Sequence, residues 1–233
     1  MPHNVEIPDY VIERIMAKRG RLHVFERFDP AKTALVVIDM QNFFVADIES
    51  ARSICPNINR LAAAVREKGG VVAWVLLTVA DRQGGPSLWP IYHDYFFSPE
   101  KMKAHKGNLT EGAEGHKLYP ELQVEDGDIV SRKSRFSCFI QGSSDLDERL
   151  RERGIENLII AGTATNFCCE TSARDAMMIG YRVVMASDAN AARYDEDHLV
   201  GLTSVWQSFG DVRTVDECID ELLAPAANEA AAE

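Results

Sequence analysis

Residues 34–39 read ALVVID, a continuous apolar run rich in β-branched side chains that closes on a single acid. An uninterrupted run of this kind is typical of a strand that is buried on both faces of a parallel sheet. Along the rest of the chain, further apolar runs alternate with segments in which apolar residues recur with the period of an α-helix. The strands predicted after this first one are 71–79, 128–133, 157–164, 182–186 and 212–215. The predicted helices are 56–68, 146–153, 167–179, 195–209 and a last one that ends at residue 223.

This alternation predicts an α/β protein. Consecutive strand–helix–strand units are right-handed and place the helices on both faces of the sheet. We therefore expect a three-layer α-β-α architecture of Rossmann-like topology around a mostly parallel sheet of about six strands. Ligands of such sheets bind at the carboxyl ends of the strands, so the residues that close each strand are the first candidates for chemistry.

The composition is that of a globular protein, since 46% of the 233 residues are hydrophobic and 26% are charged. The chain has 25 basic and 36 acidic residues, which argues against nucleic acid as a partner because nucleic-acid binders need a basic surface. No apolar run approaches the roughly 20 residues that span a bilayer, and the first residues do not resemble a signal peptide, so no membrane association is expected. The five scattered cysteines argue against a disulfide framework and favour a cytoplasmic location.

Three regions are expected along the chain. Residues 1–30 form a polar N-terminal arm with a short amphipathic helix, residues 31–224 form one α/β domain, and residues 225–233 form a disordered tail. Within the domain, residues 80–126 interrupt the alternation with a long stretch rich in Gly, Pro and aromatic residues. This stretch is either a lid over a binding site or a packed surface excursion that buries its own rings, and the sequence favours neither.

Three strands close on reactive side chains, namely Asp39, Lys133 and, a few residues beyond its strand, Cys168. Each alone has a structural explanation: a turn-forming acid, a solvated lysine in a basic patch and a small buried hydrophobe. Because parallel strands share one carboxyl edge, we expect the three to meet there. An acid, an amine and a thiol together suit covalent catalysis, in which a thiolate is the nucleophile. The helix that follows Cys168 is expected to lower the pKa of the thiol through its dipole.

The motifs around these residues resemble those of a known family. Residues 34–44 (ALVVIDMQNFF), 133–139 (KSRFSCF) and 162–176 (GTATNFCCETSARDA) are similar to three signatures of the isochorismatase-like cysteine hydrolases. That superfamily includes nicotinamidases, carbamoylsarcosine amidases and ureidoacrylate amidohydrolases. The resemblance extends over roughly residues 33–217 and implies the isochorismatase-like form of the α/β fold for the domain.

The resemblance also implies a role for each residue. Asp39 would take the proton of the Cys168 thiol, Lys133 would keep Asp39 ionised and stabilise the thiolate, and the thiolate would attack an amide carbonyl. A cis peptide between Thr163 and Ala164 would turn the Ala164 N–H toward that of Cys168 to form an oxyanion hole. Water would then hydrolyse the thioester. The neighbouring Cys169 falls on the apolar stripe of the following helix and is expected to be a buried hydrophobe.

The implied substrate is a small amide, ureide or carbamoyl compound, as in the ureidoacrylate and carbamoyl-amide branch. The metal site that nicotinamidases carry after the second strand has no counterpart at residues 78–82, so neither a metal nor any other cofactor is expected. Substrate contacts are expected from Phe44, Trp89, Phe136 and Asn166. The protein is expected to assemble as a homodimer or homotetramer. Two alternatives stay open: a vinyl-ether hydrolase in which Cys168 is incidental, and a catalytically silent binding module.

Overall fold

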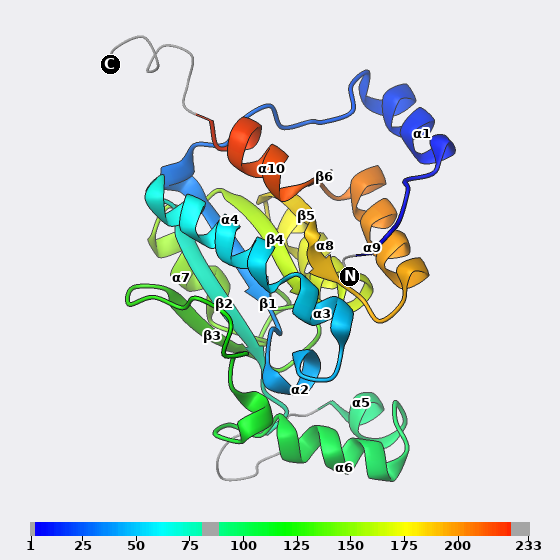
Figure 1. The fold of residues 1–233 in the computed structure, drawn as a ribbon, viewed down its shortest axis with the longest axis vertical. Coiled ribbons are helices and arrows are strands. Elements are labelled where there is room, and N and C mark those ends of the chain that lie inside the picture. Colours follow the sequence, from blue (N-terminus) through cyan, green and yellow to red (C-terminus); the bar gives the residue numbers. More distant parts are fainter. Residues whose placement is uncertain (1–2, 81–88, 225–233) are drawn as a thin grey trace.

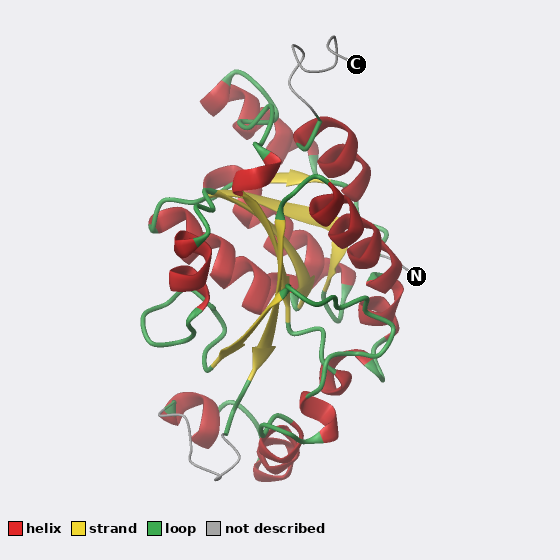
Figure 2. Cartoon of the chain, turned by 90° about the vertical axis from the view of Figure 1, so that its left-hand side faces the viewer, coloured by secondary structure: helices red, strands yellow, loops and turns green. Residues whose placement is uncertain are grey.

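The computed structural model describes residues 3–80 and 89–224. Its centre is a six-stranded sheet in the order β3-β2-β1-β4-β5-β6, in which every neighbouring pair is parallel. Figure 2 shows this sheet between two layers of helices. The predicted three-layer α/β fold is therefore confirmed. The strands are β1 (Thr33–Ile38), β2 (Val71–Leu77), β3 (Ile129–Lys133), β4 (Asn157–Thr163), β5 (Arg182–Ala191) and β6 (Asp211–Arg213).

The central strand β1 divides the core into two halves because its side chains alternate between the faces of the sheet. Ala34, Val36 and Ile38 pack in one hydrophobic cluster, and Leu35 and Val37 pack in the other. All five are fully buried, as the continuous apolar run predicts. The first cluster is covered by α1 (Asp9–Arg19), α7 (Leu146–Glu152), α8 (Glu170–Met178) and α9 (Asp195–Ser208). The second is covered by α2 (Asn42–Val45), α3 (Glu49–Ser53), α4 (Cys55–Glu67), α10 (Val215–Glu217) and η4 (Cys218–Leu222).

The predicted N-terminal arm packs against the domain over its described part. The helix expected there is α1, whose Val11 and Ile15 are fully buried in the first cluster. At its end, Arg19 donates to the Asp211 carboxylate at 3.1 Å and to the Trp206 carbonyl at 2.7 Å. The tail predicted for residues 225–233 lies outside the described residues. No described helix is long and apolar enough to span a membrane.

Two predicted elements differ most from the structure, and the others differ by one or two residues at their ends. Strand β5 continues five residues beyond the predicted end at 186, because a polar residue there finds partners within the sheet: the Asn190 NH2 group donates to the carbonyls of Ile160 and Ala186. The predicted helix 167–179 begins instead as a π-helical turn, η3 (Thr165–Cys169), which leads into α8.

The long stretch 80–126 is only partly irregular. Its described part holds α5 (Pro90–Asp94), α6 (Pro99–Asn108) and the 3₁₀ turn η2 (Glu114–His116), and a further turn, η1 (Pro30–Lys32), precedes β1. In Figure 1, α5 and α6 lie beyond the carboxyl ends of β1 and β2. Tyr92 of α5 is buried and packs with Leu77, Val79 and Leu109 in a small cluster of its own. The stretch thus buries the Tyr92 ring, leaves Tyr95 and Phe96 exposed, and stands over the edge where ligands of such sheets bind.

Candidate active site

Three side chains from three strand ends meet at the carboxyl edge of the sheet. The Lys133 ammonium lies 2.8 Å from Asp39 Oδ2 and donates to Cys168 Sγ at 3.2 Å and to the Arg135 carbonyl at 3.0 Å. The side chains of Lys133 and Asp39 are 0% and 2% exposed. The lysine therefore contacts both of the other predicted catalytic residues, although the three lie far apart in the chain.

The backbone beneath them is held in an unusual shape. Asp39 adopts a φ of 55°, in the left-handed region, and its N–H donates to the Val75 carbonyl at 2.8 Å. Beside it, Gly162 has a φ of 118°, and a Cβ there would lie 2.1 Å from the Ile38 carbonyl oxygen. Only glycine fits that approach of β4 to β1. The peptide bond between Thr163 and Ala164, which follows at once, is cis, as the family resemblance implies.

Burial controls the protonation of this cluster. It raises the pKa of Asp39, against the opposing effect of the Lys133 ammonium. For Lys133, burial alone favours the neutral form, but the adjacent Asp39 and Cys168 outweigh it and raise the lysine's pKa. Burial and the Asp39 charge raise the pKa of the Cys168 thiol. The Lys133 ammonium thus lies between the Asp39 carboxyl group and a thiol that burial keeps neutral.

This finding corrects one expectation. The helix after Cys168 was predicted to lower the pKa of the thiol, whereas the sulfur is buried and lies in η3 next to a carboxylate. The Lys133 ammonium contacts both the thiol sulfur and the Asp39 carboxylate, so a base that can take the thiol proton lies in the same cluster. The thiolate is therefore expected to form during the reaction rather than to exist beforehand.

The adjacent Cys169 takes a different position. It is fully buried and packs in the first core cluster with Ala173 and Ala176 of α8. Burial raises the pKa of its thiol well above the ordinary value. Of the two neighbouring cysteines, the structure places Cys168 against the lysine and the carboxylate.

A cavity of about 170 Å³ opens in front of Asp39 and Cys168. Thr163 and Ala164 lie in its wall together with the predicted contacts Phe44 and Phe136. Four more aromatic rings line the remaining wall, from α5, the residues after it and η3. These rings are Tyr92, Phe96, Phe97 and Phe167.

The other two predicted substrate contacts do not line this cavity. Trp89 lies behind the wall, where it stacks on Tyr92 with ring centroids 4.5 Å apart and meets Phe136 edge-on at 4.7 Å. The backbone of Asn166 packs against α9, where a Cβ on Gly201 would come within 3.0 Å of it. Both residues thus support groups that line the cavity.

Sequence reasoning missed Ala192 and Arg193, which also line the cavity. They follow directly on β5 and therefore occupy a strand end, the position that pointed to the other candidates. They were overlooked because β5 was predicted to end five residues before its actual end at Ala191. Within the described residues, no group of three or more His, Cys, Asp or Glu side chains is placed to hold a metal ion. A cofactor-free site stays a prediction.

Comparison with known proteins places the chain in a family. A model described as the isochorismatase domain matches residues 33–217. The chain belongs to the isochorismatase family. The match begins at the first residue of β1 and includes all three strand ends of the site.

Members of the isochorismatase family with named activities are among the similar proteins. The ureidoacrylate amidohydrolase RutB of Pseudomonas savastanoi pv. phaseolicola is 33% identical over 232 residues, which cover 91% of each chain. A cysteine hydrolase from Pseudomonas syringae pv. phaseolicola matches in structure with a TM-score of 0.68 and 27% identity, over 84% of this chain and 95% of that one. The N-carbamoylsarcosine amidase of Thermoplasma acidophilum matches with a TM-score of 0.63 and 27% identity, over 80% and 98%.

Proposed function

We propose that this protein is a cysteine-dependent amidohydrolase that cleaves a C–N bond of a small amide, ureide or carbamoyl compound through a thioester. The observation that carries the proposal is the contact of Asp39, Lys133 and Cys168 at the end of an aromatic cavity. A nucleophile, a base within reach of it and a cation that orients the base form the arrangement that covalent catalysis needs.

The first half of the reaction forms the thioester. Asp39 accepts the thiol proton as Cys168 Sγ attacks the carbonyl carbon, and the Lys133 ammonium offsets the negative charge that moves onto sulfur. The tetrahedral intermediate collapses with loss of ammonia or an amine, and Asp39 returns the proton to the leaving nitrogen.

The developing oxyanion needs hydrogen-bond donors. We assign this role to the backbone N–H groups of Ala164 and Cys168, because the former lines the cavity and the latter belongs to the nucleophile. One such donor typically contributes about 3–4 kcal/mol of transition-state stabilisation. In the second half, Asp39 takes a proton from water, the hydroxide attacks the thioester, and the acid product leaves as the proton returns to Cys168.

The substrate class follows from the wall of the cavity and from the relatives. Six aromatic rings around about 170 Å³ favour a small, flat molecule. The exposed Arg193 brings a cation to this wall, where it suits a carboxylate at the far end of the substrate. The names of two relatives, a ureidoacrylate amidohydrolase and an N-carbamoylsarcosine amidase, support a carbamoyl or ureido substrate.

The direct test is an ammonia-release screen over ureides, N-carbamoyl amino acids, maleamate, biuret and nicotinamide, together with a pyruvate-release assay on isochorismate as the vinyl-ether control. We expect turnover of at least one ureido or carbamoyl compound and complete loss in Cys168→Ala. Cleavage of isochorismate by both the wild type and Cys168→Ala would favour an ether hydrolase. Binding of these compounds without any turnover would favour a silent module.

A further inference from the structure

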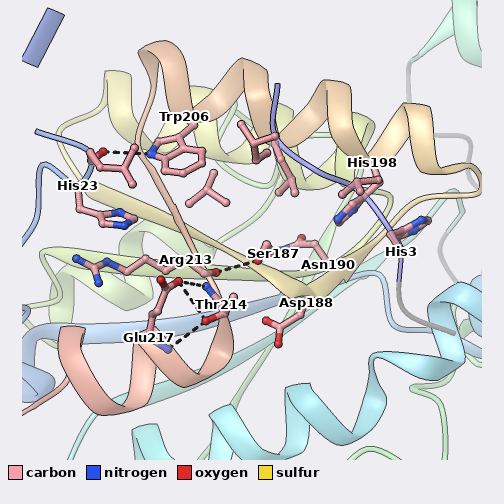
Figure 3. A pocket seen from close by; sticks show the side chains of 15 residues that line it. His3, His23, Ser187, Asp188, Asn190, His198, Trp206, Arg213, Thr214 and Glu217 are labelled. Atoms are coloured by element: carbon pink, nitrogen blue, oxygen red, sulfur yellow. Dashed lines mark hydrogen bonds between the residues drawn. The ribbon is translucent and has the colours of Figure 1, made fainter. Parts of the chain in front are cut away.

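The third residue of the chain lies against the active-site wall. His3 borders a second cavity, of about 270 Å³, between the N-terminal segment, α9 and the ends of β5 and β6. Its side chain is only 4% exposed. Figure 3 shows its ring beside that of His198, and the two stack with centroids 4.2 Å apart. His3 lies outside residues 33–217, the part that the family model matches, whereas His198 lies inside it.

Both ring nitrogens of His3 have polar partners. Nδ1 lies 2.6 Å from the Asp195 carboxylate, and Nε2 lies 3.0 Å from the backbone nitrogen of Ala192. A carboxylate only accepts and a backbone N–H only donates. Nδ1 therefore carries the proton and Nε2 accepts from Ala192, which defines one neutral tautomer. The ring connects the start of α9 to the end of β5.

The peptide group that His3 holds is part of the proposed active site. Ala192 and Arg193 line the cavity that contains Cys168. On its other side, the Ala192 carbonyl accepts from the Ser50 hydroxyl of α3 at 2.8 Å. Ala192 is thus fixed through its N–H by His3 and through its carbonyl by Ser50.

A second connection runs through the stacked ring. His198 Nδ1 lies 2.8 Å from the hydroxyl of Thr165, the first residue of η3, and both side chains are buried. Burial lowers the pKa of His198 to about 3, so this ring is neutral against the His3 ring. His3 therefore stacks on His198, which in turn contacts the first residue of η3, the turn that contains Cys168.

We propose that His3 is a positioning residue that holds the Ala192–Arg193 wall of the active site in place for substrate binding. This inference rests on the proposed function in one respect: it takes the cavity bordered by Ala192 and Arg193 to be the substrate site. Ala192 and Arg193 line the cavity without supplying any of the three reactive side chains, so loss of the His3 contact raises KM more than it lowers kcat. One neutral hydrogen bond corresponds to roughly a 3- to 10-fold change.

Three substitutions separate the two contacts of the ring. His3→Ala removes both. His3→Gln can bring an amide oxygen to the place of Nε2 and keep the acceptor for Ala192, whereas His3→Asn keeps a donor for Asp195 and does not reach Ala192. Glu6→Gln, a change at an exposed position of the same segment, is the matched control.

The experiment combines hydrogen exchange at the Ala192 amide, followed by NMR, with KM and kcat on whichever substrate the screen identifies. We expect faster exchange and a 3- to 10-fold higher KM in His3→Ala and His3→Asn, near wild-type values in His3→Gln and Glu6→Gln, and kcat within about twofold in all four. Unchanged Ala192 exchange in His3→Ala, or equal behaviour of the Ala and Gln variants, would overturn the proposal. Faster exchange in a protein that hydrolyses no compound would instead overturn the proposed function alone.

Discussion

Two of the cavities near the carboxyl edge of the sheet differ in their chemistry, and the larger of these two is not the one that holds the reactive groups. The cavity beside α9 measures about 270 Å³ and the one in front of Cys168 about 170 Å³. Both have charged residues in or directly behind their walls. The two cavities differ in the partners of these charged residues.

In the larger cavity the charges serve the local backbone. Asp188 accepts from the Val215 N–H at 2.7 Å, and Glu217 completes a capping box with Thr214. At the smaller cavity Asp39 and Lys133 pair with each other and with a thiol. A charged group that completes a turn or a helix end has a structural role. A buried acid and lysine around a nucleophile are costly to bury, so their presence points to a function. The comparison therefore identifies the site by the partners of its charges and not by its volume.

The largest effect is expected from removing the charged or nucleophilic groups at the smaller cavity. Cys168→Ala, Asp39→Asn and Lys133→Ala should each lower kcat/KM by at least roughly 1,000-fold, because residues that act as a unit fail together. Steady-state kinetics measures the loss, and far-UV circular dichroism checks that each variant is folded. An active Lys133→Ala enzyme would show that the lysine is structural.

The pH dependence of kcat/KM follows from the raised pKa of Asp39. The carboxylate must be ionised to take the thiol proton, so activity falls tenfold per pH unit below its pKa. Since burial raises this pKa, the acid limb is expected above the ordinary aspartate value of about 3.9. A pH–rate profile of the wild type gives the midpoint. A midpoint at or below the ordinary value would mean that another group, or none, is the base.

Asp188 is the acid of the larger cavity that corresponds to Asp39, and its loss should lower stability but not activity. Asp188→Ala leaves the Val215 N–H without its acceptor, which is expected to lower the free energy of unfolding by about 1–3 kcal/mol. Its kcat/KM should stay within about twofold of wild type. Urea unfolding measures the change in stability, and steady-state kinetics measures kcat/KM. A loss of activity comparable to that of Asp39→Asn would erase the distinction between the two cavities.

The smallest effect is expected at Cys169. Its sulfur is buried among apolar side chains of α8, so Cys169→Ala should cost about 1 kcal/mol of unfolding free energy and leave activity near wild type. An inactive but folded Cys169→Ala protein would mean that the nucleophile has been assigned one residue too early.

Much of the smaller site could be predicted from the sequence because of one geometric rule. Parallel strands share a carboxyl edge, so Asp39 after β1 and Lys133 at the end of β3 had to lie on the same side of the sheet. The same rule failed for Arg193, because the polar residues of β5 hid where that strand ends. Their burial depends on partners such as the Ile160 carbonyl of a neighbouring strand, which no local pattern reveals.

Other features needed the packed structure. The raised pKa of Cys168 follows from burial and from the Asp39 charge, and the sequence does not show which rings line the cavity in front of the thiol. Trp89 and Asn166 were reasonable substrate contacts by type and position, yet they pack behind the wall. His3 carries no local signal at all, since its partners lie 189 and 192 residues away in the chain.

The central claim is that Cys168 forms a thioester with the substrate. Acid quenching during turnover of an identified substrate, followed by peptide mass spectrometry with fragmentation, locates any acyl adduct. The Cys169→Ala variant leaves Cys168 as the one thiol of that neighbouring pair. We predict an adduct with the mass of the acyl group on Cys168 in the wild type and in Cys169→Ala, and none in Cys168→Ala. An adduct on Cys169, or continued turnover by Cys168→Ala, would contradict the account.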